Sequence, residues 1–249
     1  MGLLEVRKVF KAFGGLQALR DIHFMVNPGE RVGIIGPNGA GKTTLFNILS
    51  GFCQPDSGSV LLEGQEIRGK KPYQIVNLGL TRTWQLVKPF FGMTVMEAMS
   101  VPSFSYRARS KTSPLATPKE EIVQVLDQIG LGSKLWVEVD NLNQDELRLL
   151  DISRAMVTSP RILLLDEPFS GLSHKETENI SRMILDLNQR GLAVVIIEHR
   201  LRELMKLVQK VMVIHFGEKI AEGSPEEMVQ NPKVIQAYLG GRSRGLGLA

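Results

Sequence analysis

Short apolar runs recur along the chain, and Gly, Pro or charged residues bound most of them. Their length and their β-branched content predict strands. The predicted strands are EVRKVF, IHFMV, RVGIIG, SVLLEG, RILLLD, LAVVIIE and KVMVIH. Three stretches, IIG, ILLLD and VVIIE, are apolar without alternation. Such runs are typical of parallel strands that are covered on both faces.

Helical patterns lie between these runs. The predicted helix over 175–189 carries Ile180, Met183, Ile184 and Leu187, which form a stripe at positions i, i+3, i+4 and i+7. The other predicted helices cover residues 42–50, 119–129, 145–157, 200–208, 225–230 and 232–239. Alternating strands and helices indicate an α/β fold with a mainly parallel central sheet.

Two segments break this alternation. The first 30 residues or so are predicted to form an antiparallel β part, and residues 86–157 are predicted to be mainly helical, with the polar loop SYRARSKTSPLATP. The sequence therefore predicts a single domain over 1–249. Residues 1–85 and 158–249 would form its core, and residues 86–157 a helical subdomain inserted into that core. The terminal GGRSRGLGLA is expected to fray.

Composition narrows the class of protein. The chain has 249 residues, of which 43% are apolar, enough for a sizeable core. Its net charge of +4 is weak support for nucleic-acid binding and is compatible with a position near an anionic membrane surface. The single cysteine, Cys53, excludes an internal disulfide. No signal peptide and no run of ~20 apolar residues is present, so we expect a cytosolic protein that reaches a membrane through a partner.

The segment GIIGPNGAGKTT matches the phosphate-loop pattern G-x-x-x-x-G-K-[ST] through Gly36, Gly41, Lys42 and Thr43. It follows a predicted strand and opens a predicted helix. Small residues let backbone N–H groups surround phosphate oxygens, Lys42 can reach the β- and γ-phosphates, and the Thr43 hydroxyl can bind Mg²⁺. A plain glycine-rich turn would not fix all four positions. The predicted ATP-binding residues are Gly36, Pro37, Asn38, Gly39, Ala40, Gly41, Lys42, Thr43 and Thr44.

A second acidic site follows the strand RILLLD. Asp166 would hold Mg²⁺, directly or through water, and Glu167 could polarise the water that attacks the γ-phosphate. Two acidic residues after a strand could also simply begin a loop. The phosphate loop upstream favours the catalytic interpretation.

With these motifs, the chain resembles the ATPases of ATP-binding cassette (ABC) transporters over essentially its whole length. The resemblance implies the ABC cassette form of the P-loop NTPase fold. It implies that Phe13, 23 residues before Gly36, stacks on adenine, that Gln85 in LTRTWQ contacts Mg²⁺ and the attacking water, and that His199 in VVIIEHR contacts the γ-phosphate. Each residue alone would have an ordinary structural explanation. Their occurrence in family order favours the functional one.

Three longer segments, AFGGLQALRDI, GLTRTWQLVKPFFGMTVMEAM and IIEHRL, resemble the ATP-binding subunits of bacterial branched-chain amino acid importers. Relatives in that group handle hydrophobic amino acids, urea and short amides. The resemblance implies a peripheral subunit on the cytoplasmic face of the membrane. It also implies transmembrane permease subunits that dock near Gln85 and the helical subdomain, and no nucleic-acid partner. The solute itself would bind to other subunits.

One motif of the family is altered. The family's signature loop, LSGGQ or LSYGQQ, ends 20 positions before the aspartate equivalent to Asp166, and Glu146 stands there. The signature loop of this chain is therefore Leu142, Asn143, Gln144, Asp145 and Glu146. In the family this loop caps the γ-phosphate held by a second subunit. At an effective dielectric constant of ~20, a carboxylate ~4 Å from such a charge is repelled by about 4 kcal/mol. Acidic residues are also ordinary in a first helical turn.

Ser173 and Arg200 depart from the family as well, since aspartate is common at both positions. The residues that would serve this chain's own nucleotide are intact, while those offered to a partner's nucleotide are changed. This predicts an asymmetric pair with a second ABC ATPase subunit, although a homodimer is possible. A soluble ABC ATPase of the translation or DNA-repair type would usually carry tandem cassettes or a long coiled coil. A nucleotide-binding regulator with little turnover is the other alternative, and Glu167 and His199 argue against it.

Overall fold

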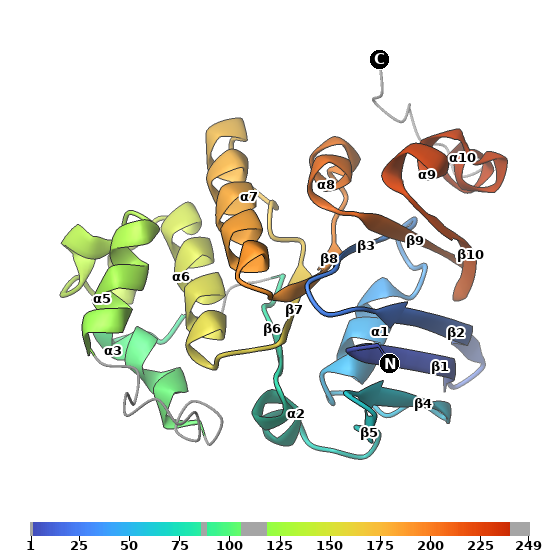
Figure 1. Cartoon of the computed structure of the whole chain (residues 1–249), viewed down its shortest axis with the longest axis horizontal. Coiled ribbons are helices and arrows are strands. Elements are labelled where there is room, and N and C mark those ends of the chain that lie inside the picture. The colour runs from blue at the N-terminus through green and yellow to red at the C-terminus, as the bar shows by residue number, and fades with distance from the viewer. Residues whose placement is uncertain (1, 86–88, 106–118, 240–249) are drawn as a thin grey trace.

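The computed structural model describes residues 2–85, 89–105 and 119–239, which form two sheets and the helices around them (Figure 1). The first sheet is antiparallel with the order β2-β1-β4-β5. Its strands are β1 (Leu4–Phe13), β2 (Leu16–Val26), β4 (Ser57–Leu62) and β5 (Gln65–Glu66). The predicted antiparallel N-terminal part is confirmed.

The second sheet has the order β10-β9-β3-β8-β7-β6. It is parallel from β9 to β6, and β10 pairs with β9 in the antiparallel direction. Its strands are β3 (Arg31–Ile35), β6 (Leu80–Arg82), β7 (Ile162–Asp166), β8 (Ala193–Ile197), β9 (Lys210–His215) and β10 (Glu218–Gly223). The mainly parallel central sheet is therefore confirmed.

The central strands are apolar at successive positions because both faces of the sheet are covered. Side chains alternate between the faces of a strand. In β7, Leu164 joins the apolar cluster shared with the antiparallel sheet, whereas Leu163 and Leu165 join the cluster beneath the helices on the opposite face. The helices that surround this core are α1 (Lys42–Leu49), α2 (Pro72–Leu78), α7 (His174–Gln189), α8 (Leu201–Leu207), α9 (Pro225–Gln230) and α10 (Pro232–Leu239).

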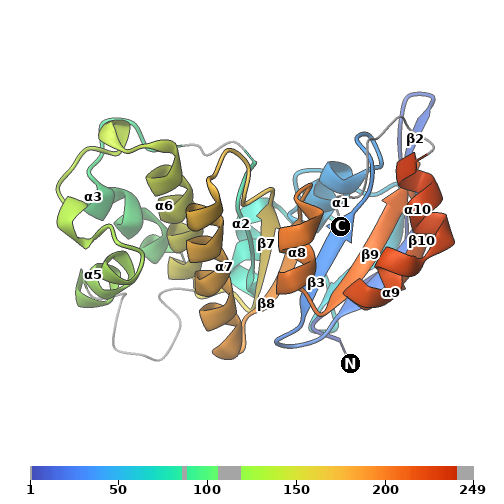
Figure 2. The ribbon, with the colours of Figure 1, turned by 90° about the horizontal axis from the view of Figure 1, so that it is seen from above.

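A group of helices lies between β6 and β7 in the chain and stands apart in space, beyond α7 from the antiparallel sheet (Figures 1 and 2). It has an apolar cluster of its own, which includes Val95, Met99, Ile122 and Leu150. The elements are α3 (Val95–Ser100), η1 (Val101–Phe104), α5 (Lys119–Gln128), η2 (Gly132–Lys134), η3 (Val139–Asn141) and α6 (Gln144–Val157). The predicted helical insert is confirmed, while the division at 86–157 stays a prediction.

Several short elements were not predicted. β6 has only three residues, too few to show a pattern, and α2 is a short helix bounded by Pro72 and by Gly79 at φ 104°. β10 is an edge strand with charged residues, and β2 begins six residues before the predicted run. The predicted loop over 106–118 and the terminal 240–249 lie outside the described residues. None of the described helices is both long and apolar enough to cross a membrane.

Candidate active site

The phosphate loop connects β3 to α1, and two of its glycines are required by close backbone contacts. A Cβ on Gly36 would lie 2.0 Å from the carbonyl oxygen of Ile214 in β9. Gly41 has a φ of 104°, and a Cβ there would lie 2.6 Å from the carbonyl oxygen of Ala18 in β2. The loop therefore lies in close contact with both sheets, with β9 at Gly36 and with β2 at Gly41. Only glycine fits at these two positions.

Lys42 is buried at the start of α1. Its Nζ donates hydrogen bonds to the carbonyl oxygens of Gly36 (2.6 Å) and Pro37 (3.0 Å). Burial lowers the pKa of Lys42, and the nearby carboxylates of Glu167 and Asp166 act in the opposite direction. These carboxylates stabilise a buried ammonium group beside the predicted phosphate site. Thr43, the next residue, is exposed.

Phe13 ends β1 with 51% of its surface exposed. Lys11 Nζ lies 5.2 Å from the centroid of its ring. Phe13 pairs with Leu16 at the turn between β1 and β2, and Ala18 farther along β2 contacts Gly41. The turn that carries this exposed aromatic ring thus adjoins the phosphate loop, as an adenine-stacking residue requires.

Asp166 ends β7 and is buried against a residue that the sequence analysis did not identify. Arg82 Nη2 donates to Asp166 Oδ2 (2.6 Å), and Arg82 Nη1 donates to Asn47 Oδ1 in α1 (2.7 Å). Both side chains of the ion pair are at most 4% exposed. Burial lowers the pKa of Arg82, and the hydrogen bond to Asp166 opposes this effect. Arg82 therefore connects the acidic strand end to the helix that follows the phosphate loop.

The three predicted catalytic residues meet at one carboxylate. Gln85 Nε2 donates to Glu167 Oε2 (2.9 Å), and His199 Nε2 forms a hydrogen bond with Glu167 Oε1 (2.9 Å). Glu167 adopts a φ of 49°, which is uncommon for a residue other than glycine. Three separate segments thus bring an amide, an imidazole and a carboxylate together beside the phosphate loop.

Two buried charged residues hold these segments, and the sequence analysis missed both. Glu198 Oε2 accepts hydrogen bonds from the backbone N–H groups of His199 (2.7 Å) and Arg200 (2.9 Å). Its Oε1 accepts from the N–H of Phe169 (2.8 Å) in the loop after β7. The sequence did offer a signal for Glu198, since it stands between an apolar strand and His199. An acidic side chain at the end of a buried strand needs hydrogen-bond partners.

Arg148 is the second of these residues, on the buried face of α6. Its guanidinium donates to the carbonyl oxygens of Trp84 and Gln85, at 2.7 Å each. The helix that begins at the signature loop therefore fixes the backbone of the glutamine that contacts Glu167.

The signature loop is a well-formed helix start. Asn143 Oδ1 accepts from the N–H of Glu146 (2.9 Å), and the N–H of Asn143 donates to Glu146 Oε2 (3.2 Å), which makes a capping box for α6. Lys134 Nζ donates to Glu146 Oε1 (2.6 Å). Leu142 is buried, and Gln144 is exposed. Asn143 and Glu146 thus have structural partners within their own chain.

Asp145 has a different neighbour. Its carboxyl group interacts with the carboxyl group of Glu176 of α7. Burial, followed by the interaction with Glu176, raises the pKa of Asp145 to about 6. Ser173 and Asp145 both lower the pKa of Glu176, with Ser173 contributing most. The signature loop is thereby tied to the N-terminus of α7, which Ser173 caps.

Arg200 also has structural contacts. Its guanidinium donates to the carbonyl oxygen of Leu172 (2.6 Å) and to the hydroxyl of Thr177 (3.0 Å). The arginine that replaces the family's common aspartate therefore anchors the loop before α7 from within the same chain.

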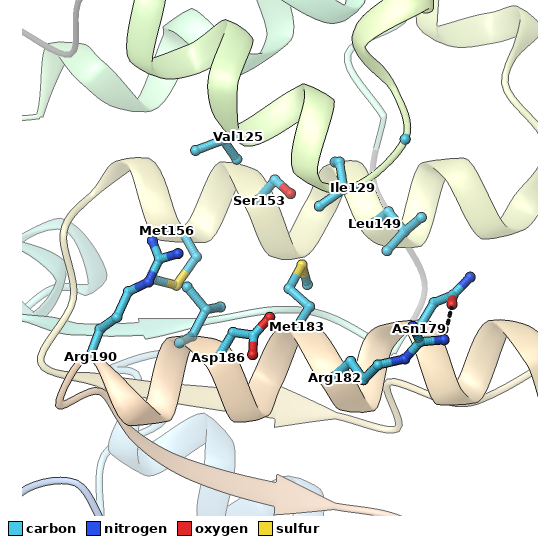
Figure 3. Close-up of a pocket in the computed structure, with 12 residues that line it drawn as sticks. Val125, Ile129, Leu149, Ser153, Met156, Asn179, Arg182, Met183, Asp186 and Arg190 are labelled. Atoms are coloured by element: carbon cyan, nitrogen blue, oxygen red, sulfur yellow. Dashed lines mark hydrogen bonds between the residues drawn. The ribbon is translucent and has the colours of Figure 1, made fainter.

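A cavity of ≈ 610 Å³ lies elsewhere, between α5, α6 and α7 (Figure 3). Ile129, Leu149 and Met183 form much of its apolar wall, and Arg182 on its rim donates to Asn179 Oδ1 (3.0 Å). Its lining includes no residue of the phosphate loop and none of Gln85, Glu167 and His199. The cavity is distinct from the candidate active site.

Comparison with known proteins identifies the family. A family model described as ABC transporter matches residues 19–170, and one described as branched-chain amino acid ATP-binding cassette transporter matches residues 218–243. The chain is 38% identical to the high-affinity branched-chain amino acid transport ATP-binding protein LivG of Escherichia coli K12, covering 96% of this chain and 98% of LivG. The corresponding protein BraF of Pseudomonas aeruginosa is 36% identical, with the same coverage.

Solved structures agree with this assignment. An ATP-binding cassette of an ABC transporter in its ADP conformation superposes with a TM-score of 0.84 at 30% identity, covering 96% of this chain and 99% of that one. A nucleotide-free cassette gives a TM-score of 0.85 at the same identity. The chain is a nucleotide-binding ATPase that belongs to the ATP-binding subunits of ABC transporters, in the branched-chain amino acid transport group.

Proposed function

We propose that this chain binds MgATP at its phosphate loop, hydrolyses it with Glu167, and drives solute uptake through membrane permease subunits. The observation that carries the proposal is the meeting of Gln85 and His199 at the Glu167 carboxylate, close to Lys42. A water-activating base, two polar groups that sense the γ-phosphate and a phosphate-binding lysine are the parts that ATP hydrolysis needs.

Nucleotide binding requires Lys42 to change partners. Its ammonium group bonds to the carbonyl oxygens of Gly36 and Pro37, and phosphate oxygens are stronger acceptors for it. Phe13 offers an exposed ring for the adenine base. The N–H groups at the start of α1 add positive potential toward the phosphates.

Mg²⁺ would be held by oxygen atoms, which are the ligands it prefers. The exposed hydroxyl of Thr43 and the carboxylate of Asp166 supply two of them. Arg82 binds Asp166 Oδ2, so the other carboxylate oxygen is the one left to face the metal. Gln85 donates its amide N–H to Glu167, which leaves Oε1 as its acceptor end. Bound Mg²⁺ neutralises charge on the β- and γ-phosphates.

Glu167 then has a defined task. Its carboxylate orients the water that forms the new P–O bond, and it accepts the water's proton as the bond to ADP breaks. Gln85 and His199 hydrogen-bond to its two oxygens. With MgATP bound, Gln85 and His199 would contact the metal and the γ-phosphate, and Glu167 would be available to the water.

The transport role rests on the relatives and on the surface next to Gln85. LivG and BraF are branched-chain amino acid transport proteins by name, so branched-chain amino acids or related small amides are the proposed solutes. A cavity of ≈ 240 Å³ is lined by Trp84, which directly precedes Gln85 in the chain, and by Phe90 and Pro102. We assign this surface to a cytoplasmic helix of the permease. The chain would then lie on the cytoplasmic face of the membrane.

The altered signature loop supports an asymmetric pair. In a homodimer, an Asp145 would face each nucleotide, and burial and the neighbouring Glu176 already make a negative charge unfavourable at that position. In a heterodimer, the nucleotide on Lys42 would meet an intact loop from the partner cassette, and Glu167 would hydrolyse it. The nucleotide on the partner would meet the altered loop and turn over slowly.

The direct test of the nucleotide site is calorimetry with MgATP. Lys42→Ala should lose most ATP affinity, because within the described residues no second cationic side chain hydrogen-bonds to the phosphate loop. Lys206→Ala is the matched control, since Lys206 is 64% exposed on α8. Equal affinities for the wild type and Lys42→Ala would refute the site.

A further inference from the structure

The buried Arg82 side chain joins the two elements that carry the proposed Mg²⁺ ligands. It is 3% exposed, and its Nη2 donates to Asp166 Oδ2 (2.6 Å) at the end of β7. Its Nη1 donates to Asn47 Oδ1 (2.7 Å) and to the hydroxyl of Ser50 (3.3 Å), at the C-terminal end of α1. The other proposed ligand, Thr43, lies at the N-terminal end of the same helix. One guanidinium group therefore fixes Asp166 relative to the helix that carries Thr43.

The same guanidinium group lies over two aromatic rings. Arg82 Cζ is 4.5 Å from the centroid of the Trp84 ring and 5.4 Å from the centroid of the Phe46 ring. Hydrogen bonds of a guanidinium group lie in its plane, whereas its attraction to an aromatic ring acts across its face. The two kinds of contact do not compete. The rings therefore help to keep the guanidinium plane in the orientation in which it reaches both Asp166 and Asn47.

Trp84 is itself fixed by groups that do not belong to the acidic site. Arg148 in α6 donates to the carbonyl oxygen of Trp84 (2.7 Å). Phe52, in the turn after α1, meets the indole ring edge-on, with 4.8 Å between the ring centroids and an interplanar angle of 79°. The indole is thus supported from α6 and from the end of α1, and it can serve as a fixed surface for Arg82.

The separation of Thr43 from Asp166 matters because of the ion that they would share. Mg²⁺ demands near-octahedral geometry with metal–oxygen distances of ~2.0–2.1 Å, whereas the larger Ca²⁺ accepts flexible geometry and varied numbers of oxygen ligands. A small shift of the Asp166 carboxylate relative to α1 would therefore weaken binding of Mg²⁺ more than binding of Ca²⁺.

We propose that Arg82 and Trp84 act together as positioning residues for the Mg²⁺ ion of the nucleotide site. Arg82 sets the distance between Asp166 and the helix that carries Thr43, and the Trp84 ring keeps the Arg82 guanidinium in place. Neither side chain touches the metal or the nucleotide in this account. The proposal rests on the nucleotide site proposed above.

The test is Trp84→Leu in the full chain, with calorimetry of ATP in EDTA, of MgATP and of CaATP. Loss of a desolvated cation–π contact predicts a rise of about three- to tenfold in the dissociation constant for MgATP. The dissociation constants for CaATP and for ATP in EDTA should change less than about twofold. Trp84→Phe keeps an aromatic face and should recover most of the MgATP affinity. Trp136→Phe is the matched control, since Trp136 is 72% exposed.

Arg82→Lys tests whether the two side chains act as one unit. Lysine keeps the charge but lacks the planar fork that reaches Asp166 and Asn47 together, so the MgATP dissociation constant should rise about tenfold. Adding Trp84→Leu to Arg82→Lys should weaken MgATP binding little further, because the ring acts through the guanidinium.

Trp84 emission gives a readout that needs neither nucleotide nor metal. The chain has two tryptophans, so Trp136→Phe leaves Trp84 as the single emitter. In that background, Arg82→Lys should shift the emission maximum, because it removes the guanidinium group from the indole ring.

An MgATP-specific loss in Trp84→Leu that Trp84→Phe recovers and that is not additive with Arg82→Lys would support the proposal. Unchanged MgATP affinity in Trp84→Leu, an equal loss in EDTA or with Ca²⁺, fully additive losses, or an unchanged emission maximum would overturn it. Failure of the nucleotide site itself would appear separately, as wild-type affinity in Lys42→Ala.

Discussion

His199 and Glu167 are 32 positions apart in sequence, yet His199 Nε2 lies 2.9 Å from Glu167 Oε1. They meet because β7 and β8 are neighbouring parallel strands in which Asp166 pairs with Ile197. Each residue follows the carboxyl end of its strand, where ligand sites form in open α/β sheets. The imidazole and the carboxylate are therefore placed together by the sheet itself and do not depend on a flexible loop.

Glu167→Gln should separate ATP binding from hydrolysis. Glutamine keeps the shape and can still contact Gln85 and His199, but it cannot accept a proton from water. MgATP affinity should stay within about threefold of wild type, while hydrolysis falls by a factor of about 10² or more. Calorimetry and steady-state phosphate release measure the two quantities. Hydrolysis at the wild-type rate would assign the base role to another group.

Arg82→Met should destabilise the fold by about 3–5 kcal/mol, because it leaves the buried Asp166 carboxylate without its partner. Urea unfolding measures the change, and the double variant Arg82→Met with Asp166→Asn should recover part of the loss. Arg20→Met is the control. Arg20 forms an exposed ion pair with Glu218 at 3.0 Å, and such pairs contribute at most about 1 kcal/mol. Equal losses in the two single variants would contradict the role of the buried pair.

The interaction between the carboxyl groups of Asp145 and Glu176 predicts a pH effect on stability. Burial and Glu176 raise the pKa of Asp145 to about 6 from its ordinary value of 3.8, and Glu146 acts in the same direction. The folded state then binds the Asp145 proton more strongly than the unfolded state. The stronger proton binding stabilises the folded state at pH values below the ordinary pKa of Asp145. This stabilisation is lost as pH rises through the pKa of Asp145 in the folded state.

Asp145→Asn removes the titrating group, so the variant should not lose this contribution to stability. Its free energy of unfolding should therefore rise relative to that of the wild type as pH increases from about 4.5 to 7. The lowered pKa of Glu176 produces the opposite slope, in the more acidic range below its ordinary value of 4.5. Urea unfolding of both proteins at several pH values measures the difference. Parallel pH profiles would show that Asp145 titrates normally.

The long elements could be predicted from the sequence. The predicted helices over 42–50 and 175–189, like the others, agree with the structure to within one residue at each end. In the longer helices, such as 175–189, the apolar stripe extends over two or more turns. The phosphate loop could be predicted from the spacing of Gly36, Gly41, Lys42 and Thr43 alone. The meeting of Glu167 with His199 follows from parallel strands that end at one edge.

The polar contacts could not be predicted, because they join distant positions through tertiary packing. Arg82 is 84 positions from Asp166, and β6, which presents it, is too short to show a pattern. Lys134 comes from a single 3₁₀ turn, and its ion pair with Glu146 changes the electrostatic argument for the signature loop. The charge of Glu146 is locally compensated, so the repulsion of a partner's nucleotide falls mainly on Asp145.

The altered signature loop also predicts how activity can be restored. Asn143→Ser, Asp145→Gly and Glu146→Gln together would return the family's residue types at these positions. Serine and glutamine retain the capping box of α6, so the helix start should persist. The change removes the carboxylates that would face the second nucleotide of a homodimer.

Steady-state ATPase activity of the purified chain, with and without these three changes, tests the central claim most directly. The account predicts low activity for the unmodified chain alone and a clear rise for the restored loop, with Glu167→Gln abolishing the activity of both. If the unmodified chain already hydrolyses ATP like an ordinary cassette and the restored loop adds nothing, the asymmetric account is contradicted.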